Sequence, residues 1–214
     1  MNSKNIPLIS VFSILLGMFP QTVQPAPIGV GAQEQIRPYL QVKQVPGDEN
    51  IVRVFFSPGC QFSKQYFQFF TNLERTLPER RRFLFTPLVN KGDGLSYALS
   101  VLAVERFYPA YTNHFIEASL IGVQDRGLSA RNWAAIDRVG RAAHLPKPIS
   151  KLVYDNIDVL RKDLQVTLEV QQRLGVTNTP SVSVAGTYII TPEFTAGDSK
   201  MFSQLVNAVI SMSY

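Results

Sequence analysis

The sequence contains one cysteine, Cys60, among its 214 residues, and this scarcity excludes several classes of protein. A chain with one thiol cannot form an internal disulfide, so it is not a small secreted domain stabilised by disulfides. The two histidines, His114 and His144, have no second cysteine or acidic cluster around them, so no metal site is predicted. The Gly-rich turn at Gly92–Gly94 has none of the surroundings of a phosphate-binding loop, and no cofactor is predicted.

Charge is also sparse and is spread along the chain. Lys and Arg exceed Asp and Glu by 21 − 16 = +5, and charged residues make up 17% of the sequence. The one basic run, Arg80–Arg82, fits a solvated turn between a helix and a strand better than a site for phosphate or for an acidic partner. Nucleic acid is therefore not predicted as a partner. The hydrophobic fraction of 45% suits one folded domain with its own core.

The first 32 residues contain one charged residue, Lys4, and an apolar run from Ile6 to Phe19. This run is shorter than the ~20 residues that a membrane-spanning helix needs, and small residues follow it, which is typical of an export signal. Cleavage after Ala32 satisfies the small-x-small rule, and an uncleaved N-terminal anchor is the alternative. The sequence therefore predicts a signal peptide, a periplasmic or other extracytoplasmic location, and no stable membrane span after signal removal.

Three segments around Cys60 predict a strand, a helix and a second strand. Asn50–Phe56 is a short hydrophobic run bounded by turn sequences, which is typical of a buried central strand. From Gln61, apolar residues recur at helical spacing until Pro78 ends the helix, and Arg82–Val89 is a second strand-forming run. A strand, helix and strand of these lengths form a βαβ unit, whose strands are parallel.

The remaining chain predicts a helical tract, two short strands around a tight turn at Gly186, and a last helix capped by Asp198 or Ser199 with Met201 in its apolar stripe. The expected helices of the tract are Leu95–Phe107, Tyr111–Ile121, Ala130–Leu145, Ile149–Tyr154 and Val159–Leu174. This order predicts an α/β fold with an all-helical insert. The expected division is a signal peptide at 1–32, an N-terminal segment at 33–49, a sheet domain at 50–93 and 176–214, and a helical insert at 94–175.

Two motifs in this arrangement resemble the thioredoxin fold, and in particular its DsbA-like branch. VFFSPGCQFSKQYFQFF, at 54–70, is similar to that family's active-site turn, and LGVTNTPSVSVAGTYIITPE, at 174–193, is similar to its cis-proline loop and β-hairpin. The resemblance covers the chain from Tyr39 to the C-terminus and implies a thioredoxin fold with an inserted helical subdomain. It also implies a cis bond before Pro180, with Gln61, Phe62, Thr179 and Pro180 as substrate-binding residues.

The sequence departs from the family where the chemistry takes place. Oxidising members of the family have a C-x-x-C motif, whereas this motif reads Cys60, Gln61, Phe62 and Ser63. Many catalytic relatives have a buried carboxylate at the position that matches Val54, and DsbA has a histidine at the position of Phe62. A lone cysteine with neither group cannot be an oxidase that donates its own disulfide.

A cysteine at the first turn of a helix retains some of the usual activation. The free N–H groups and the positive end of the helix dipole favour the thiolate. Ser63, one turn further, is expected to donate a hydrogen bond to the sulfur, and Lys64 is expected to add a nearby positive charge. Ser63 cannot attack a mixed disulfide as a second thiol would. Cys60 and Ser63 are therefore the predicted catalytic residues of a site that can form, but not resolve, a mixed disulfide.

Two functions follow from these residues. The first is an exported thiol-disulfide exchange protein, related in chemistry to oxidoreductases or isomerases. It would act through Cys60 on cysteine-containing or unfolded extracytoplasmic proteins, with an external thiol as resolving partner. The second is a non-enzymatic binding or chaperone module that keeps the peptide-binding groove without needing the thiol, and a secretion or pilus-assembly apparatus is one setting in which fold analogy would place it.

Overall fold

The computed structural model describes residues 37–90 and 94–213, so the predicted signal peptide lies outside the described residues. One five-stranded sheet has the order β1-β5-β4-β2-β3. The strands are β1 (Leu40–Gln41), β2 (Ile51–Phe56), β3 (Arg82–Pro87), β4 (Ser181–Val184) and β5 (Tyr188–Ile190). The helices are α1 (Gln61–Gln65), α2 (Phe67–Thr76), α3 (Gly94–Phe107), α4 (Thr112–Arg126), α5 (Trp133–Ala142), α6 (Ile149–Asp155), α7 (Ile157–Leu174) and α8 (Ser199–Met212), with short 3-10 turns η1 (Pro109–Tyr111) and η2 (Pro192–Thr195).

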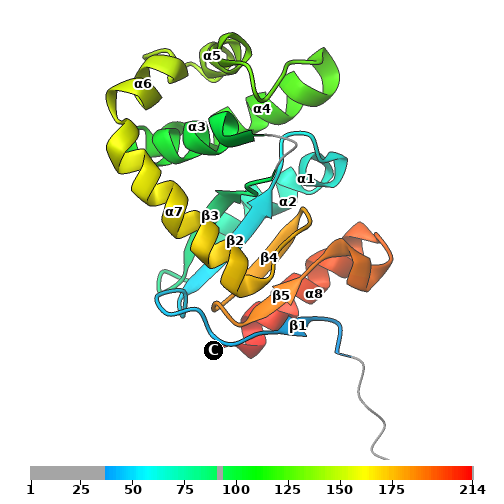
Figure 1. Ribbon diagram of the computed structural model, residues 1–214. Helices are drawn as coiled ribbons and strands as arrows, with labels where there is room; N and C mark the ends of the chain where they lie inside the picture. Colours follow the sequence, from blue (N-terminus) through cyan, green and yellow to red (C-terminus); the bar gives the residue numbers. More distant parts are fainter. Residues whose placement is uncertain (1–36, 91–93, 214) are drawn as a thin grey trace, which may run out of the picture. The chain divides into compact units, whose positions relative to one another are not determined.

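The sheet confirms the predicted thioredoxin-like arrangement. β2 and β3 are parallel neighbours, with Val54 paired to Phe85, and α1 and α2 connect them as the helical part of a βαβ unit. β4 lies antiparallel on the other side of β2, and β5 continues the hairpin. Between this βαβ unit and the hairpin in the sequence come α3 to α6, which Figure 1 shows grouped together above the sheet, with α7 returning along the sheet. The fold is therefore α/β with a helical insertion.

The alternation of side chains along β2 separates two hydrophobic layers. Val52, Val54 and Phe56 point to the side that holds α1, α2 and α8, and they belong to the main core. Phe55 points to the opposite side and packs with Leu174 at the end of α7. Both layers are excluded from water, since Val54 and Phe55 are fully buried. The sheet is thus covered on both faces, which explains why its central strand β2 is hydrophobic at every position but Arg53.

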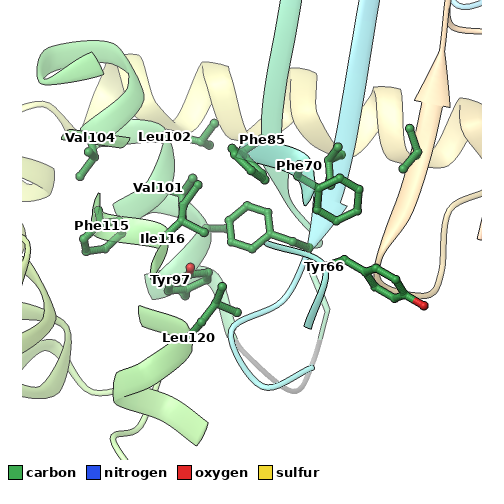
Figure 2. Close-up of a cluster of buried hydrophobic side chains, with 14 of the residues drawn as sticks. Tyr66, Phe70, Phe85, Tyr97, Val101, Leu102, Val104, Phe115, Ile116 and Leu120 are labelled. Atoms are coloured by element: carbon green, nitrogen blue, oxygen red, sulfur yellow. The ribbon is translucent and has the colours of Figure 1, made fainter. Parts of the chain in front are cut away.

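The main core continues from the sheet into the inserted helices. The ring of Phe56 makes an edge contact with Tyr97 of α3 at 6.2 Å, and Tyr97 stacks on Phe115 of α4 at the same centroid separation. Figure 2 shows this cluster, in which Phe70 and Phe85 on the sheet side approach the side chains of α3 and α4. The insert and the sheet therefore share one hydrophobic core, and each aromatic contact adds about 0.5–1.5 kcal/mol beyond its buried area.

The hairpin between β4 and β5 contains the tight turn predicted at Gly186. Ala185 and Gly186 both have left-handed backbone angles, with φ of 54° and 62°, and the Thr187 N–H donates to the Val184 carbonyl at 3.1 Å. Two consecutive positive φ values give the turn type whose twist matches a β-hairpin. A Cβ atom on Gly186 would lie 2.8 Å from the Asp48 Cβ, so the turn packs tightly against the segment before β2.

Three local features of the structure differ from what the sequence predicts. The predicted helix from Gln61 to Pro78 is interrupted at Tyr66, whose buried hydroxyl donates to the Gly197 carbonyl and whose ring packs 4.8 Å from Phe202. β1, only two residues long, was not predicted because so short a strand has no sequence pattern. Met201, expected in the apolar stripe of α8, is 55% exposed.

The basic run Arg80–Arg82 is not simply a solvated turn. The Arg81 side chain is buried and donates to the Glu49 carbonyl at 3.0 Å and to the Ser213 carbonyl at 2.6 Å. Arg81 therefore joins the start of β2 to the end of α8.

Among the helices in the described part of the chain, none is long and apolar enough to span a bilayer.

A surface cleft of about 540 Å³ lies between the sheet, α3 and α7, and no residue of the Ser57–Cys60 turn lies in its wall. Its lining residues are Arg53, Arg82, Leu84, Leu102, Glu105, Arg106, Asp163, Val166 and Thr167. Burial raises the pKa of Glu105 above its ordinary value of 4.5, against the opposing effect of Arg53 and Arg82. The folded protein thus binds a proton at Glu105 more tightly than the unfolded chain does.

We expect Glu105→Gln to stabilise the protein at neutral pH and to have little effect at acidic pH. Because the folded pKa is raised, the stability linked to Glu105 is fully present below the unfolded pKa and is lost as pH rises through the folded pKa. Glutamine, neutral at every pH, does not have this loss. Urea unfolding of both proteins at pH 7.5 and pH 4 measures the difference; an equal difference in unfolding free energy at the two pH values would contradict the assignment.

Candidate functional site

Two strand ends bring the predicted site residues to one edge of the sheet. β2 ends at Phe56 and continues into the Ser57–Cys60 turn, while the Thr179–Pro180 loop comes directly before β4. Because β2 and β4 are antiparallel, with Phe55 paired to Ser181, the end of one strand lies beside the start of the other. The Thr179–Pro180 peptide bond is cis. The turn and the loop thus meet although they are far apart in the sequence.

The Cys60 thiol contacts the loop directly. Its Sγ donates a hydrogen bond to the Thr179 carbonyl at 3.1 Å, and the side chain is half-buried. Cys60 is the N-cap residue of α1, and its own N–H donates to the Ser57 carbonyl at 3.2 Å. α1 has only five residues, so the dipole of a single turn, and not of the longer helix that was predicted, acts on the sulfur.

The surroundings of the sulfur differ from those predicted. Ser63 is buried, and its Oγ accepts a hydrogen bond from the Ser57 N–H at 3.4 Å, while the sulfur bonds to the Thr179 carbonyl. Lys64, expected to place a positive charge near the thiol, instead forms an ion pair with Asp125, with its Nζ 2.7 Å from Oδ2. In the structure Ser63 therefore stabilises the turn, and the charge of Lys64 is compensated by a carboxylate of α4.

An apolar cleft of about 390 Å³ opens beside the thiol. It is lined by Phe62, Asn178, Thr179, Pro180, Thr191, Pro192, Glu193, Ala196 and Gly197. Phe62 is 37% exposed, and its ring stacks on that of the buried Tyr66. Gln61, the fourth predicted substrate-binding residue, is exposed at the start of α1 and does not line the cleft. The segment from Thr191 to Gly197 completes the wall, and nothing in its sequence indicated this role.

The end of α4 also contacts the active-site turn. The Gln124 Nε2 donates to the carbonyls of Pro58 and Cys60, at 2.9 and 3.0 Å. Asp125, the next residue, pairs with Lys64. Sequence reasoning missed both residues because they occupy ordinary polar positions at the end of an amphipathic helix.

The described residues offer little to a metal ion. Within 37–90 and 94–213, no group of three or more His, Cys, Asp or Glu side chains is arranged to hold one. His114 and His144 do lie together, in the wall of a surface cleft of about 250 Å³ that also includes Glu117 and Arg126. That cleft is formed by α4 and the end of α5, and it is separate from the cleft beside Cys60. The groups that the candidate site brings together are the Cys60 thiol, the Thr179 carbonyl and the apolar cleft beside them.

A parallel βαβ unit, a hairpin that follows a cis-proline and a set of helices inserted between them define the DsbA-like form of the thioredoxin fold. No protein-family model and no curated protein matches the chain. Solved structures of DsbA proteins do match it. A complex of Proteus mirabilis DsbA with a non-covalently bound peptide has a TM-score of 0.68 and 15% identity, covering 82% of this chain and 95% of that one.

Two further DsbA structures give the same result. The oxidoreductase DsbA of Xylella fastidiosa has a TM-score of 0.65 and 15% identity, covering 80% of this chain and 90% of that one. DsbA of Pseudomonas aeruginosa has a TM-score of 0.64 and 14% identity, covering 81% of this chain and 94% of that one. These matches establish the fold, while the function of this chain depends on its own residues.

Proposed function

We propose that this protein is an exported thiol-disulfide exchange protein that acts through the single nucleophile Cys60. The contact of the Cys60 Sγ with the Thr179 carbonyl, 3.1 Å apart at the edge of an apolar cleft, supports this proposal most directly. A peptide lying in the cleft can pair its backbone with Thr179 as an added strand, which brings a substrate sulfur next to Cys60. In this proposal residues 1–32 are a signal peptide and residues 94–175 are an inserted helical subdomain.

The chemistry has two balanced steps. The Cys60 thiolate attacks one sulfur of a substrate disulfide, the substrate S–S bond breaks, and the released substrate thiolate takes up a proton. A second thiol then attacks the mixed disulfide, which frees Cys60. If that thiol is the released cysteine or another cysteine of the substrate, the substrate disulfide is re-formed or rearranged with no net oxidation. If it is an external thiol, its attack on the substrate sulfur frees Cys60 and leaves the substrate joined to that thiol by a disulfide. A second external thiol then attacks this disulfide, which releases the reduced substrate and an external disulfide.

The partners in this proposal are cysteine-containing or unfolded extracytoplasmic proteins, together with an external thiol. The peptide bound in the Proteus mirabilis DsbA structure shows that a related fold holds a short peptide without a covalent bond. In this chain the cleft is lined mainly by backbone and apolar groups, with Phe62 exposed at its edge. Such a surface favours extended segments with apolar side chains over any one sequence.

We expect the wild-type protein to form a stable mixed disulfide with a cysteine peptide activated as its thionitrobenzoate disulfide. Capture should be at least about tenfold faster than by a synthetic peptide of residues 54–67, because the fold orients the thiol and binds the substrate. Release of the chromophore gives the rate, and mass spectrometry identifies the adduct. Cys60→Ala is the control without a thiol and should release no chromophore.

A second function is a binding or chaperone module that does not need the thiol. The cleft of about 390 Å³ supports it, because Cys60 is not one of the residues that line this cleft. The two functions differ in the behaviour of Cys60→Ala. If the wild type captures the activated peptide no faster than the 54–67 peptide does, while Cys60→Ala binds the unactivated peptide as tightly as the wild type, the exchange function is wrong and the binding module remains.

A further inference from the structure

The side chain of Gln124 makes the main polar contact between the helical insert and the active-site turn. It reaches from the last turn of α4, and one nitrogen, Nε2, donates to two carbonyls, 2.9 Å from Pro58 and 3.0 Å from Cys60. These carbonyls stand on either side of Gly59, the exposed residue of the turn. The amide therefore holds both sides of the one position where the turn has no side chain to restrict it.

Cys60 is fixed through several groups, and Gln124 supplies one of them. The Cys60 N–H donates to the Ser57 carbonyl at 3.2 Å, and the Cys60 carbonyl accepts from the Lys64 N–H at 3.3 Å and from Gln124. The sulfur donates to the Thr179 carbonyl. The contacts with Ser57 and Lys64 are made within the turn and its own helix. Among the hydrogen bonds of the described residues, those with Gln124 and Thr179 connect Cys60 to distant parts of the chain.

The same end of α4 makes a second contact with α1, which fixes where the turn lies relative to the insert. Asp125 pairs with Lys64, one turn into α1. This pair is partly exposed, with 36% of the Lys64 side chain and 50% of the Asp125 side chain accessible to solvent. Like other surface pairs, it contributes about 1 kcal/mol or less to stability. Gln124 is half-buried and donates to groups that have little access to water, so its bonds are the more effective ones.

We propose that Gln124 is a positioning residue for Cys60, through which the helical insert holds the thiol against the Thr179 loop. Gln124 does not touch a substrate in this proposal. It fixes the Pro58 and Cys60 carbonyls, and this fixes the direction of the Cys60 side chain toward the cleft. The proposal rests on Cys60 as the reacting group of the proposed function, but its first test needs no disulfide exchange.

The test uses two variants that keep the length of the side chain and remove its donor. Gln124→Met is uncharged, and Gln124→Glu has a carboxylate that only accepts hydrogen bonds at neutral pH. Gln204→Glu, on the exposed surface of α8, is the matched control for added negative charge. All three proteins are compared with the wild type in thermal unfolding, in alkylation of Cys60 by iodoacetamide, and in capture of the activated cysteine peptide.

We expect the two Gln124 variants to change the two reactions of Cys60 in opposite directions. Alkylation by the small reagent, which needs only access to sulfur, should become about threefold faster as the turn loosens. Capture of the peptide, which needs the sulfur to point into the cleft, should become about tenfold slower, as expected for the loss of two hydrogen bonds of ordinary strength. Gln204→Glu should match the wild type in both reactions.

General loosening of the fold would lower the unfolding temperature, so opposed changes at an unchanged unfolding temperature separate positioning from a loss of stability. Unchanged alkylation in both variants overturns the proposal, as does a parallel rise or fall of both reactions. If the wild type captures no peptide, the proposed exchange function fails, and the proposal about Gln124 is then decided by alkylation alone: faster alkylation supports it and an unchanged rate overturns it.

Discussion

Ser63→Cys is expected to shorten the lifetime of the mixed disulfide on Cys60 by at least about a hundredfold, because the resolving thiol then belongs to the same molecule. Cys60 is the N-cap residue of α1 and Ser63 is the third residue of that helix, two positions whose side chains lie together at a helix start. The introduced thiol attacks the Cys60 sulfur, the substrate leaves as a free thiol, and the two protein sulfurs remain joined as a disulfide. The measurement is the decay of the purified adduct by mass spectrometry.

Two control variants isolate the role of the second sulfur. Ser63→Ala removes the acceptor for the Ser57 N–H without adding a thiol, so it reports the cost of disturbing the turn. Ser211→Cys adds a thiol on the exposed surface of α8 and shows whether any second cysteine in the protein accelerates release. An adduct of Ser63→Cys as long-lived as that of the wild type would show that these side chains do not meet, and the family-like geometry of the site would be wrong.

Asp48→Ala is expected to destabilise the protein by about 3 kcal/mol, because it leaves the mostly buried Arg53 guanidinium without the carboxylate to which it is hydrogen-bonded. Asp48 is 4% exposed and receives two bonds from Arg53, Nε to Oδ2 at 3.0 Å and Nη2 to Oδ1 at 2.8 Å. The remaining Arg53 nitrogen donates to Thr86 at 3.0 Å across to β3. Urea unfolding at neutral pH measures the loss of free energy.

The matched control is Asp155→Ala on α6. Asp155 pairs with Lys151 one helical turn away, but the two side chains are 38% and 63% exposed, so this change should cost about 0.5 kcal/mol or less. The double variant Asp48→Ala with Arg53→Met should recover much of the stability lost in Asp48→Ala, because it removes the unpaired charge. Equal losses for Asp48→Ala and Asp155→Ala would show that burial does not determine the value of these pairs.

Much of the fold could be predicted because its signals are local. Each of three local patterns predicts the element in which it occurs: the hydrophobic run predicts β2, the helical spacing after Gln61 predicts a helix, and Gly186 predicts the hairpin turn. The interruption at Tyr66 could not be predicted in this way. Its causes are the Gly197 carbonyl and the Phe202 ring, which come from the far end of the chain.

The candidate site, like the fold, has parts that the sequence predicts and parts that depend on tertiary packing. The motifs place Cys60 and Thr179 at strand ends that share one edge of the sheet, and the structure has their atoms 3.1 Å apart. Sequence could not show that Asp125 takes the charge of Lys64, or that Gln124 reaches the turn, because the angle at which α4 packs against α1 decides both. Polar residues at a helix end have many alternative positions, and only tertiary packing selects one.

The distance along the chain between the two halves of the site has a consequence for biosynthesis. Cys60 and the Thr179 carbonyl that covers its sulfur are 119 residues apart, with the whole helical tract between them. At about 5–20 residues per second, a ribosome needs roughly ten seconds to make that interval. During that time Cys60 has been synthesised, but the Thr179 loop that contacts its sulfur has not. The thiol of the newly made chain is therefore more open to exchange with passing disulfides than the thiol of the finished protein is.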